Sequence, residues 1–163
     1  MASVYLSLGS NIDRSKNLCA GLDALVARFG DLTMSQVYES EAVGFDGDNF
    51  YNLVVGIETA LPVGELALQL RQIEDDNGRL RSGPKFSART LDIDILTYDD
   101  LTGEIDGVKL PRGEILKNAF VLLPLSELAP DTRHPVEGAT YQQLWEAYDQ
   151  ASQKLWPVAF NWP

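Results

Sequence analysis

Apolar residues along this chain follow two different periods, and each change of period marks the boundary of an element. Residues 3–9 alternate in character and are rich in residues that favour extended structure, which predicts a first strand. From Leu18 to Phe29 the apolar residues recur at helical spacing, which predicts a helix. Gly30 follows at the position where glycine commonly caps the end of a helix.

The middle of the chain predicts further strands and a second helix. Residues 32–40 and 50–59 have the composition of two strands and are separated by an acidic loop. Pro62 begins a second helix that ends at Gly78, and residues 90–98 form a further strand. The resulting order, β-α-β-β-α-β, predicts an α+β fold with a ferredoxin-like core. Because this fold supports many functions, it predicts no chemistry by itself.

The last third of the chain predicts additions to that core. Residues 99–107 form a turn that leads into a short extended piece at 108–111, which together predict an additional hairpin. Residues 120–128 and 141–154 predict two C-terminal helices. The tail after them carries two tryptophans, which we expect to be buried against the domain.

Length and composition restrict the class of protein. Residues 1–163 contain no internal repeat or linker and are expected to form a single domain. No apolar stretch approaches the roughly 18 residues of a membrane-spanning helix, and the N-terminus does not have the pattern of a signal peptide. The single cysteine, Cys19, fits a reducing cytoplasm, and we expect inert packing for it. We also expect a monomer.

The distribution of charge says more than the total. A net charge of −11 argues against nucleic-acid polymers and anionic membranes as partners. Basic residues nevertheless concentrate in one part of this acidic chain, which suggests a small polyanionic ligand. On composition alone, a solvated loop rich in charge is the better interpretation, so other features must decide. Eight of the 13 basic residues fall in that part: Arg71, Arg79, Arg81, Lys85, Arg89, Lys109, Arg112 and Lys117.

An Asp-x-Asp pair on the predicted strand 90–98 supplies such a feature. Alternate residues of a strand share a face, so Asp92 and Asp94 project together with Cα atoms roughly 7 Å apart. A divalent cation such as Mg²⁺ would relieve the repulsion between two carboxylates, and it typically also binds substrate phosphates. A bare Asp-x-Asp pair is more often an exposed strand face, here one that could pair with Arg89. The basic loop directly before it, Arg79 to Ala88, is what favours phosphoryl transfer.

The same segment carries a resemblance to a known family. Residues 85–96, Lys-Phe-Ser-Ala-Arg-Thr-Leu-Asp-Ile-Asp-Ile-Leu, resemble the signature of the 6-hydroxymethyl-7,8-dihydropterin pyrophosphokinases of folate biosynthesis. Four other pieces are similar to that family in order and spacing, so the likeness covers nearly the whole chain: residues 5–11, 50–55, 72–79 and 120–130.

This resemblance implies a reaction and a set of catalytic residues. ATP would give its β,γ-diphosphate to the hydroxymethyl oxygen of the pterin and leave as AMP. Asp92 and Asp94 would bind two Mg²⁺ ions that bridge the triphosphate, and Arg79 and Arg89 would contact the phosphates. The remaining residues implied near the nucleotide are Arg71, Glu74, Arg81, Lys85, Ile95, Lys109 and Arg112.

The resemblance also implies a pocket for a reduced pterin. Asn52 would hydrogen-bond the amide edge of the ring, and Phe50 and Phe120 would stack on its two faces. Ser40, Val43 and Gly44 would complete the pocket. Before the resemblance is considered, the two phenylalanines are more often core residues, and Asn52 could mark an edge or a bulge of a strand. His134, in a predicted surface turn, is assigned no role.

Several positions depart from the family pattern. Ser87 and Ala88 stand where family members usually have Gly-Pro, and Phe86 stands where they have Trp. Arg112 and Asn118 replace a histidine and an arginine. Three hypotheses therefore stand: an active pyrophosphokinase, a non-catalytic module that binds pterin or nucleotide, and an acidic interaction domain with a merely solvated basic loop.

Overall fold

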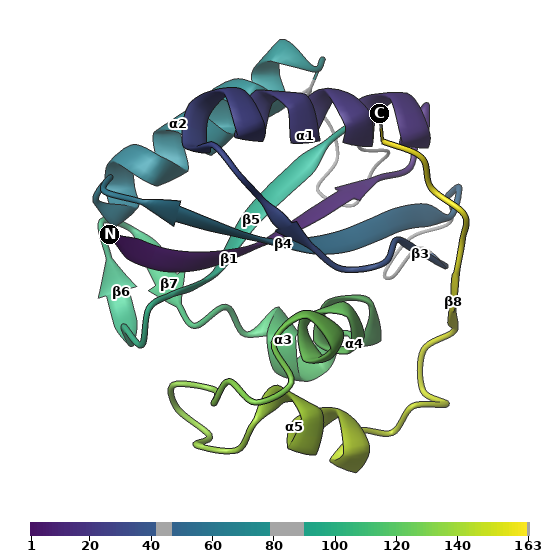
Figure 1. The fold of residues 1–163 in the computed structure, drawn as a ribbon. Helices are drawn as coiled ribbons and strands as arrows, with labels where there is room; N and C mark the ends of the chain where they lie inside the picture. The colour runs from purple at the N-terminus through teal and green to yellow at the C-terminus, as the bar shows by residue number, and fades with distance from the viewer. Residues whose placement is uncertain (42–46, 79–89, 163) are drawn as a thin grey trace.

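An antiparallel sheet forms the centre of the structure, a computed structural model that describes residues 1–41, 47–78 and 90–162. Its strands run in the order β5-β1-β4-β3-β8, and β2 pairs with another part of β4 (Figure 1). The alternating segments of the sequence form its three long strands, which are neighbours in this order, with β5 at the edge. The strands are β1 (Ala2–Ser10), β2 (Thr33–Met34), β3 (Tyr38–Ser40), β4 (Phe50–Thr59), β5 (Asp92–Tyr98) and β8 (Leu155–Pro157).

Helices cover both faces of this sheet. Figure 1 shows α1 (Arg14–Phe29) and α2 (Val63–Asp76) together on one face, and α4 (Ala119–Leu128) on the other. The short helix α3 (Glu114–Lys117) precedes α4, and α5 (Tyr141–Ala147) packs beneath it. The predicted ferredoxin-like α+β core is confirmed, since the two helices of the β-α-β-β-α-β unit share one face. The predicted additional hairpin is formed by two further strands, β6 (Gly103–Ile105) and β7 (Val108–Leu110).

Strand register decides which residues meet at the centre of the sheet. Gly9 of β1 lies opposite Asn52 of β4 on one side and Asp92 of β5 on the other. Ser7 lies opposite Asp94. Because side chains alternate along a strand, the leucines on either side of Ser7 point to the opposite face, where α1 and α2 cover them.

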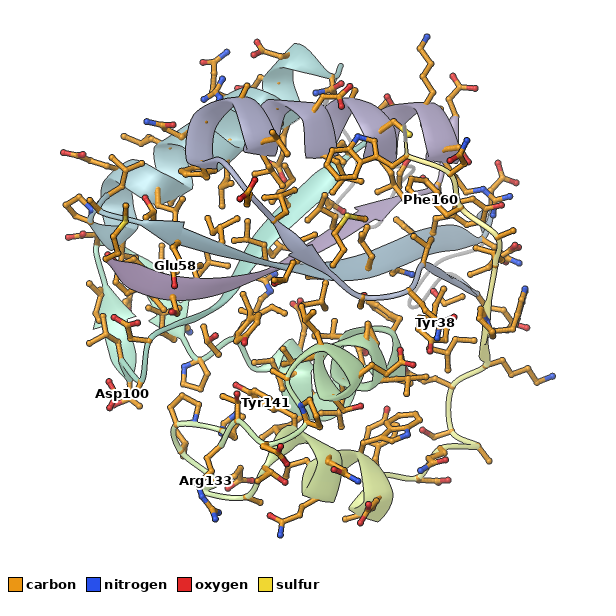
Figure 2. The ribbon with its side chains drawn as sticks, viewed as in Figure 1. Tyr38, Glu58, Asp100, Arg133, Tyr141 and Phe160 are labelled. Atoms are coloured by element: carbon orange, nitrogen blue, oxygen red, sulfur yellow. The ribbon has the colours of Figure 1, made fainter. Side chains whose placement is uncertain are left out.

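Two apolar clusters, one on each face, hold these layers together (Figure 2). The cluster under α1 and α2 contains the aliphatic residues on one face of β1, β4 and β5, including Leu6, Leu8 and Leu53, all 0% exposed. The second cluster joins Val54 and Leu96 of the sheet to α4 and to Tyr141 of α5.

Two predicted elements differ in length from the observed ones. Residues 32–40 form two short strands because the Ser35 hydroxyl accepts the N–H of Val54 at 3.0 Å and takes the place of a ladder acceptor. The helix predicted over 141–154 ends at Ala147, since Tyr148 adopts an extended backbone and its hydroxyl donates to the carbonyl of Lys117 at 2.7 Å.

The C-terminal tail departs from the prediction in two ways. Its residues Leu155–Pro157 form β8, an unpredicted strand that pairs with β3. Trp162 packs against the larger cluster and donates to Asp23 at 2.8 Å, as expected of a half-buried indole. The expectation was wrong for Trp156, which is 39% exposed. Cys19 is partly buried, and its thiol approaches the carbonyl of Asn161 at 3.7 Å.

His134 corrects a further expectation. The side chain lies 3% exposed beneath Tyr141, not at the surface of a turn. Its Nδ1 accepts the backbone N–H groups of Val136 and Glu137 at 3.1 and 3.0 Å. Burial lowers the pKa of His134, although nearby Glu137 acts in the opposite direction. The residue is therefore a neutral internal cap of the loop between α4 and α5.

Candidate active site

A cavity of about 260 Å³ lies between the sheet and the beginning of α4. It occupies the face opposite α1 and α2, where the register brings three strands together. Polar and aromatic side chains from separate elements share its wall, which is the arrangement expected of a small-molecule site. The residues that line it are Ser7, Gly9, Ser40, Glu41, Phe50, Asn52, Asp92, Asp94, Arg112, Glu114, Asn118, Phe120 and Val121.

The two aspartates of β5 both face this cavity. Asp92 and Asp94 are half-buried, whereas Ile93 and Ile95 between and after them are 5% and 6% exposed in the aliphatic cluster. The predicted common face of the carboxylates is therefore observed, and it is the face that carries the cavity. Adjacent carboxylate oxygens are ligands of the kind that Mg²⁺ takes, together with substrate phosphates.

Glu74 holds this part of β5 in place from α2. Its side chain is buried, and Oε2 accepts the backbone N–H of Ile93 at 2.8 Å. Ile93 stands between the two aspartates, so this bond fixes the backbone from which both carboxylates project. Glu74 was expected near the nucleotide, and the structure places it directly behind the aspartate pair.

Arg112 contributes a cation to the cavity. Its guanidinium donates two hydrogen bonds to Glu114, from Nε at 2.6 Å and from Nη2 at 2.9 Å. Nη2 also lies 3.7 Å from Oδ1 of Asp94. Burial lowers the pKa of Arg112, but Asp94, Glu114 and Glu74 raise it, and the net change is upward. Arg112 therefore stays charged beside the candidate metal ligand.

Asn52 presents an amide to the opposite end of the cavity. Its Nδ2 donates to the hydroxyl of Ser40 at 2.8 Å, and both residues are buried. Its Oδ1 would lie only 3.0 Å from a Cβ at Gly9, so the glycine makes room for this side chain. The side-chain amide of Asn52 is thus fixed by a hydrogen bond and faces the cavity, and the residue does not mark an edge or a bulge of the strand.

Phe50 and Phe120 line the cavity from different elements. Phe50 begins β4, while Phe120 lies in the first turn of α4, and both side chains are half-buried. Neither belongs to the fully buried residues of the two clusters. This placement favours aromatic walls of a ligand pocket over ordinary core packing.

Other predicted site residues lie away from this cavity or outside the described residues. Ile95 packs in the aliphatic cluster, while Arg71 on α2 and Lys109 on β7 are exposed. None of these three lines the cavity. The predicted residues outside the described residues are Val43, Gly44, Arg79, Arg81, Lys85 and Arg89.

The sequence-based prediction missed six residues that line the cavity, two of which, Asn118 and Val121, lie beside Phe120 at the start of α4. Ser7 and Gly9 lie on β1 across from the aspartates, and Glu41 and Glu114 lie near Ser40 and Arg112. Alternation along β1 was a usable signal for Ser7 and Gly9, because these small residues alternate with Leu6 and Leu8. Only the strand register shows that they meet Asp94 and Asp92.

Comparison with known proteins identifies the family. Residues 5–130 match the family model described as 7,8-dihydro-6-hydroxymethylpterin-pyrophosphokinase (HPPK). The chain belongs to this family. Relatives named 2-amino-4-hydroxy-6-hydroxymethyldihydropteridine pyrophosphokinase include one from Aquifex aeolicus, 37% identical over 83% of this chain and 86% of that protein. Another, from Synechocystis, is 35% identical over 94% of this chain and 76% of that protein.

Solved structures agree on the fold. A crystal structure of Plasmodium falciparum HPPK-DHPS with SDX-DHP superposes with a TM-score of 0.67 over 91% of this chain, at 17% identity. This chain spans 44% of that longer protein. The predicted family and its pyrophosphokinase function in folate biosynthesis are confirmed by the comparisons. Within the described residues, no helix is long and apolar enough to cross a membrane.

Proposed function

We propose that this chain transfers the β,γ-diphosphate of ATP to the hydroxymethyl group of 6-hydroxymethyl-7,8-dihydropterin and releases AMP. The observation that carries the proposal is a single cavity that joins a carboxylate pair on β5 to an amide and two aromatic rings. One end has the chemistry for a triphosphate, and the other has the chemistry for a flat heterocycle.

The pterin is assigned to the end of the cavity formed by β4 and α4. Asn52 would face the amide edge of the ring, because a primary amide offers both a donor and an acceptor. Its bond to Ser40 restricts the amide before any ligand arrives, which lowers the entropic cost of binding. Phe50 and Phe120 would stack on the ring. Val43 and Gly44 stay predictions for the same pocket.

Asp92 and Asp94 have the donor chemistry for Mg²⁺. Both carboxylates face the cavity from alternate positions of one strand that Glu74 fixes from behind. When bound, Mg²⁺ would neutralise phosphate charge and help to align ATP with the hydroxyl of the pterin. The protein's own part is to hold the two reactants together and to limit the water around them. The number of ions, two, stays a prediction.

Cations of the chain are assigned to the triphosphate. Arg112 lies at the cavity and keeps its charge, so it can contact a phosphate once the polyanion competes with Glu114. Arg79, Arg89, Arg81 and Lys85 are assigned to the phosphates from the resemblance alone. Arg71, Glu74, Ile95 and Lys109 are assigned to the surroundings of the nucleotide on the same ground. A cytoplasmic monomer also stays a prediction.

The test is release of AMP from ATP in the presence of Mg²⁺ and 6-hydroxymethyl-7,8-dihydropterin. We expect stoichiometric AMP and pterin diphosphate, both abolished when the pterin is omitted or when EDTA removes the metal. ADP formation would indicate transfer of a single phosphoryl group and would contradict the proposal. Pterin binding without any AMP above a protein-free control would identify the non-catalytic module instead, an alternative that the comparisons do not support.

A further inference from the structure

The C-terminal segment (residues 148–158) returns to the cavity, although the family match ends at residue 130. In β8, Leu155 pairs with Ser40 of the cavity wall, and Val158 donates its N–H to the carbonyl of Val37 at 3.0 Å. Figure 1 shows this part of the chain running from α5 past β3 towards α1. The segment therefore contacts the sheet side of the candidate pterin pocket.

The same segment holds the helical side of the pocket through one amide. Oε1 of Gln153 accepts the N–H of Ala119 at 2.9 Å, and Nε2 donates to Oδ1 of Asn118 at 3.1 Å and to the carbonyl of Lys117 at 3.3 Å. Asn118 is the residue that precedes α4, and its own side chain makes no cap hydrogen bond. Gln153 thus caps α4 from 34 residues further along the chain.

The position of this cap matters for the pocket. Ala119 is 1% exposed, so removing the Gln153 side chain would leave its N–H buried without a hydrogen bond. An unpaired buried N–H lowers the stability of the folded state. Its neighbours Asn118 and Phe120 line the cavity. Gln153 and Leu155 also line a second hollow of about 390 Å³, which shares Ser40, Glu41 and Phe120 with the first.

We propose that Gln153 is a positioning residue for the pterin: its amide fixes the start of α4, and with it the ring of Phe120 and the amide of Asn118. This inference rests on the proposed function of the cavity. The ATP end depends on β5, which Gln153 does not touch. Loss of the amide should therefore weaken pterin binding and leave nucleotide binding unchanged.

Gln153→Ala tests this directly. We expect the KM for the pterin to rise roughly five- to tenfold, the equivalent of one buried hydrogen bond, with the KM for ATP within about twofold of wild type. Gln150→Ala is the matched control, because its amide donates to the carbonyl of Trp145 in α5 and, among the described residues, makes no hydrogen bond to α4. Both KM values of that control should equal those of wild type.

Gln153→Glu separates positioning from general stability. The carboxylate keeps an acceptor for Ala119 at the start of a helix, where a negative charge is favourable, but it loses the donor to Asn118 and to the carbonyl of Lys117. Its pterin KM should therefore lie between those of wild type and Gln153→Ala. Thermal unfolding of all variants would confirm that each is folded at the assay temperature.

The outcomes distinguish this inference from the function on which it rests. A wild-type protein that releases no pterin-dependent AMP would contradict the proposed function before any variant is compared. An active wild type with an unchanged pterin KM in Gln153→Ala would overturn the positioning role alone. Equal rises in the KM for ATP and for the pterin would also overturn it, as would equal losses in Gln153→Ala and Gln153→Glu.

Discussion

The two faces of the central sheet are built from the same strands and do different things. Towards α1 and α2, β1 and β5 present Leu6, Leu8, Ile93 and Ile95, all buried in one aliphatic cluster. Towards α4, the residues between them are small or polar and line the cavity. Because side chains alternate, an apolar layer packs on the face of the sheet directly opposite the candidate active site.

This contrast explains how polar groups can be held accurately in so small a protein. Glu74 illustrates the principle, because it reaches across from the helical layer and fixes the strand that carries the aspartates. The layer behind the site supplies stability, while the layer in front supplies chemistry. Substitutions on the two faces should therefore separate stability from activity.

The largest effect is expected from the carboxylates. Asp92→Asn and Asp94→Asn should each lower kcat on the order of 10²–10⁴-fold, since a neutral amide is a poor Mg²⁺ ligand. Calorimetry with Mg²⁺ and a non-hydrolysable ATP analogue should show weakened metal binding. Asp100→Asn is the matched control, at an exposed turn after β5 that Figure 2 labels. Turnover within a few-fold of wild type in both site variants would contradict the metal assignment.

The opposite result, a loss of stability without a loss of activity, is expected for Leu8 of β1. Leu8 is 0% exposed and lies between Ser7 and Gly9 on the other face. Leu8→Ala should lower the free energy of unfolding by about 3 kcal/mol, measured by urea denaturation, because it leaves a cavity in the aliphatic cluster. Activity per folded molecule should stay within about threefold.

The control for that experiment is Leu68→Ala on α2. Leu68 is 68% exposed, so its loss should change stability by less than about 0.5 kcal/mol. A large loss of turnover in folded Leu8→Ala would show that the two faces are not independent.

A smaller effect is expected for the pH dependence of the free energy of unfolding, to which His134 in the loop after α4 contributes. His134 is neutral when folded and its pKa is lowered mainly by burial, so below about pH 6.5 the unfolded chain binds more protons. Stability from this group is complete above that pH and is lost as the pH falls through the folded pKa. His134→Asn keeps an acceptor but cannot titrate.

The measurement is the free energy of unfolding at pH 7 and pH 5. The decrease between them should be smaller in His134→Asn than in wild type. Identical decreases would show that His134 does not contribute to acid sensitivity.

The smallest effect is expected at the contact between two strands. Gly9→Ala places a methyl group 3.0 Å from Oδ1 of Asn52, so the amide must shift by a few tenths of an ångström. The pterin KM should rise about three- to tenfold, with little change in kcat. Gly113→Ala is the matched control, because no atom of the described residues beyond its chain neighbours lies within 4 Å of its added carbon and its backbone is helical. Equal pterin KM values in Gly9→Ala and Gly113→Ala would contradict the assignment of Asn52 to the pterin pocket.

Local patterns were sufficient for much of the fold. Apolar period and glycine position predicted β1, α1, α2 and β5, because each of these elements buries one continuous face. The break between β2 and β3 could not be predicted, since it depends on one hydroxyl of Ser35 meeting Val54 across the sheet. The same holds for β8, whose partner among the described strands, β3, lies over a hundred positions earlier in the chain.

By itself, the sequence determined the chemistry that is available: a carboxylate pair on one strand face, a concentration of bases, and the motifs of a pyrophosphokinase family. Only the tertiary structure decided which of these groups meet. Register set Gly9 between Asn52 and Asp92, and the return of the C-terminal segment brought Gln153 to the first N–H of α4. The physical reason is that alternation is a local property of a strand, whereas register and capping by distant residues depend on the packing of the whole chain.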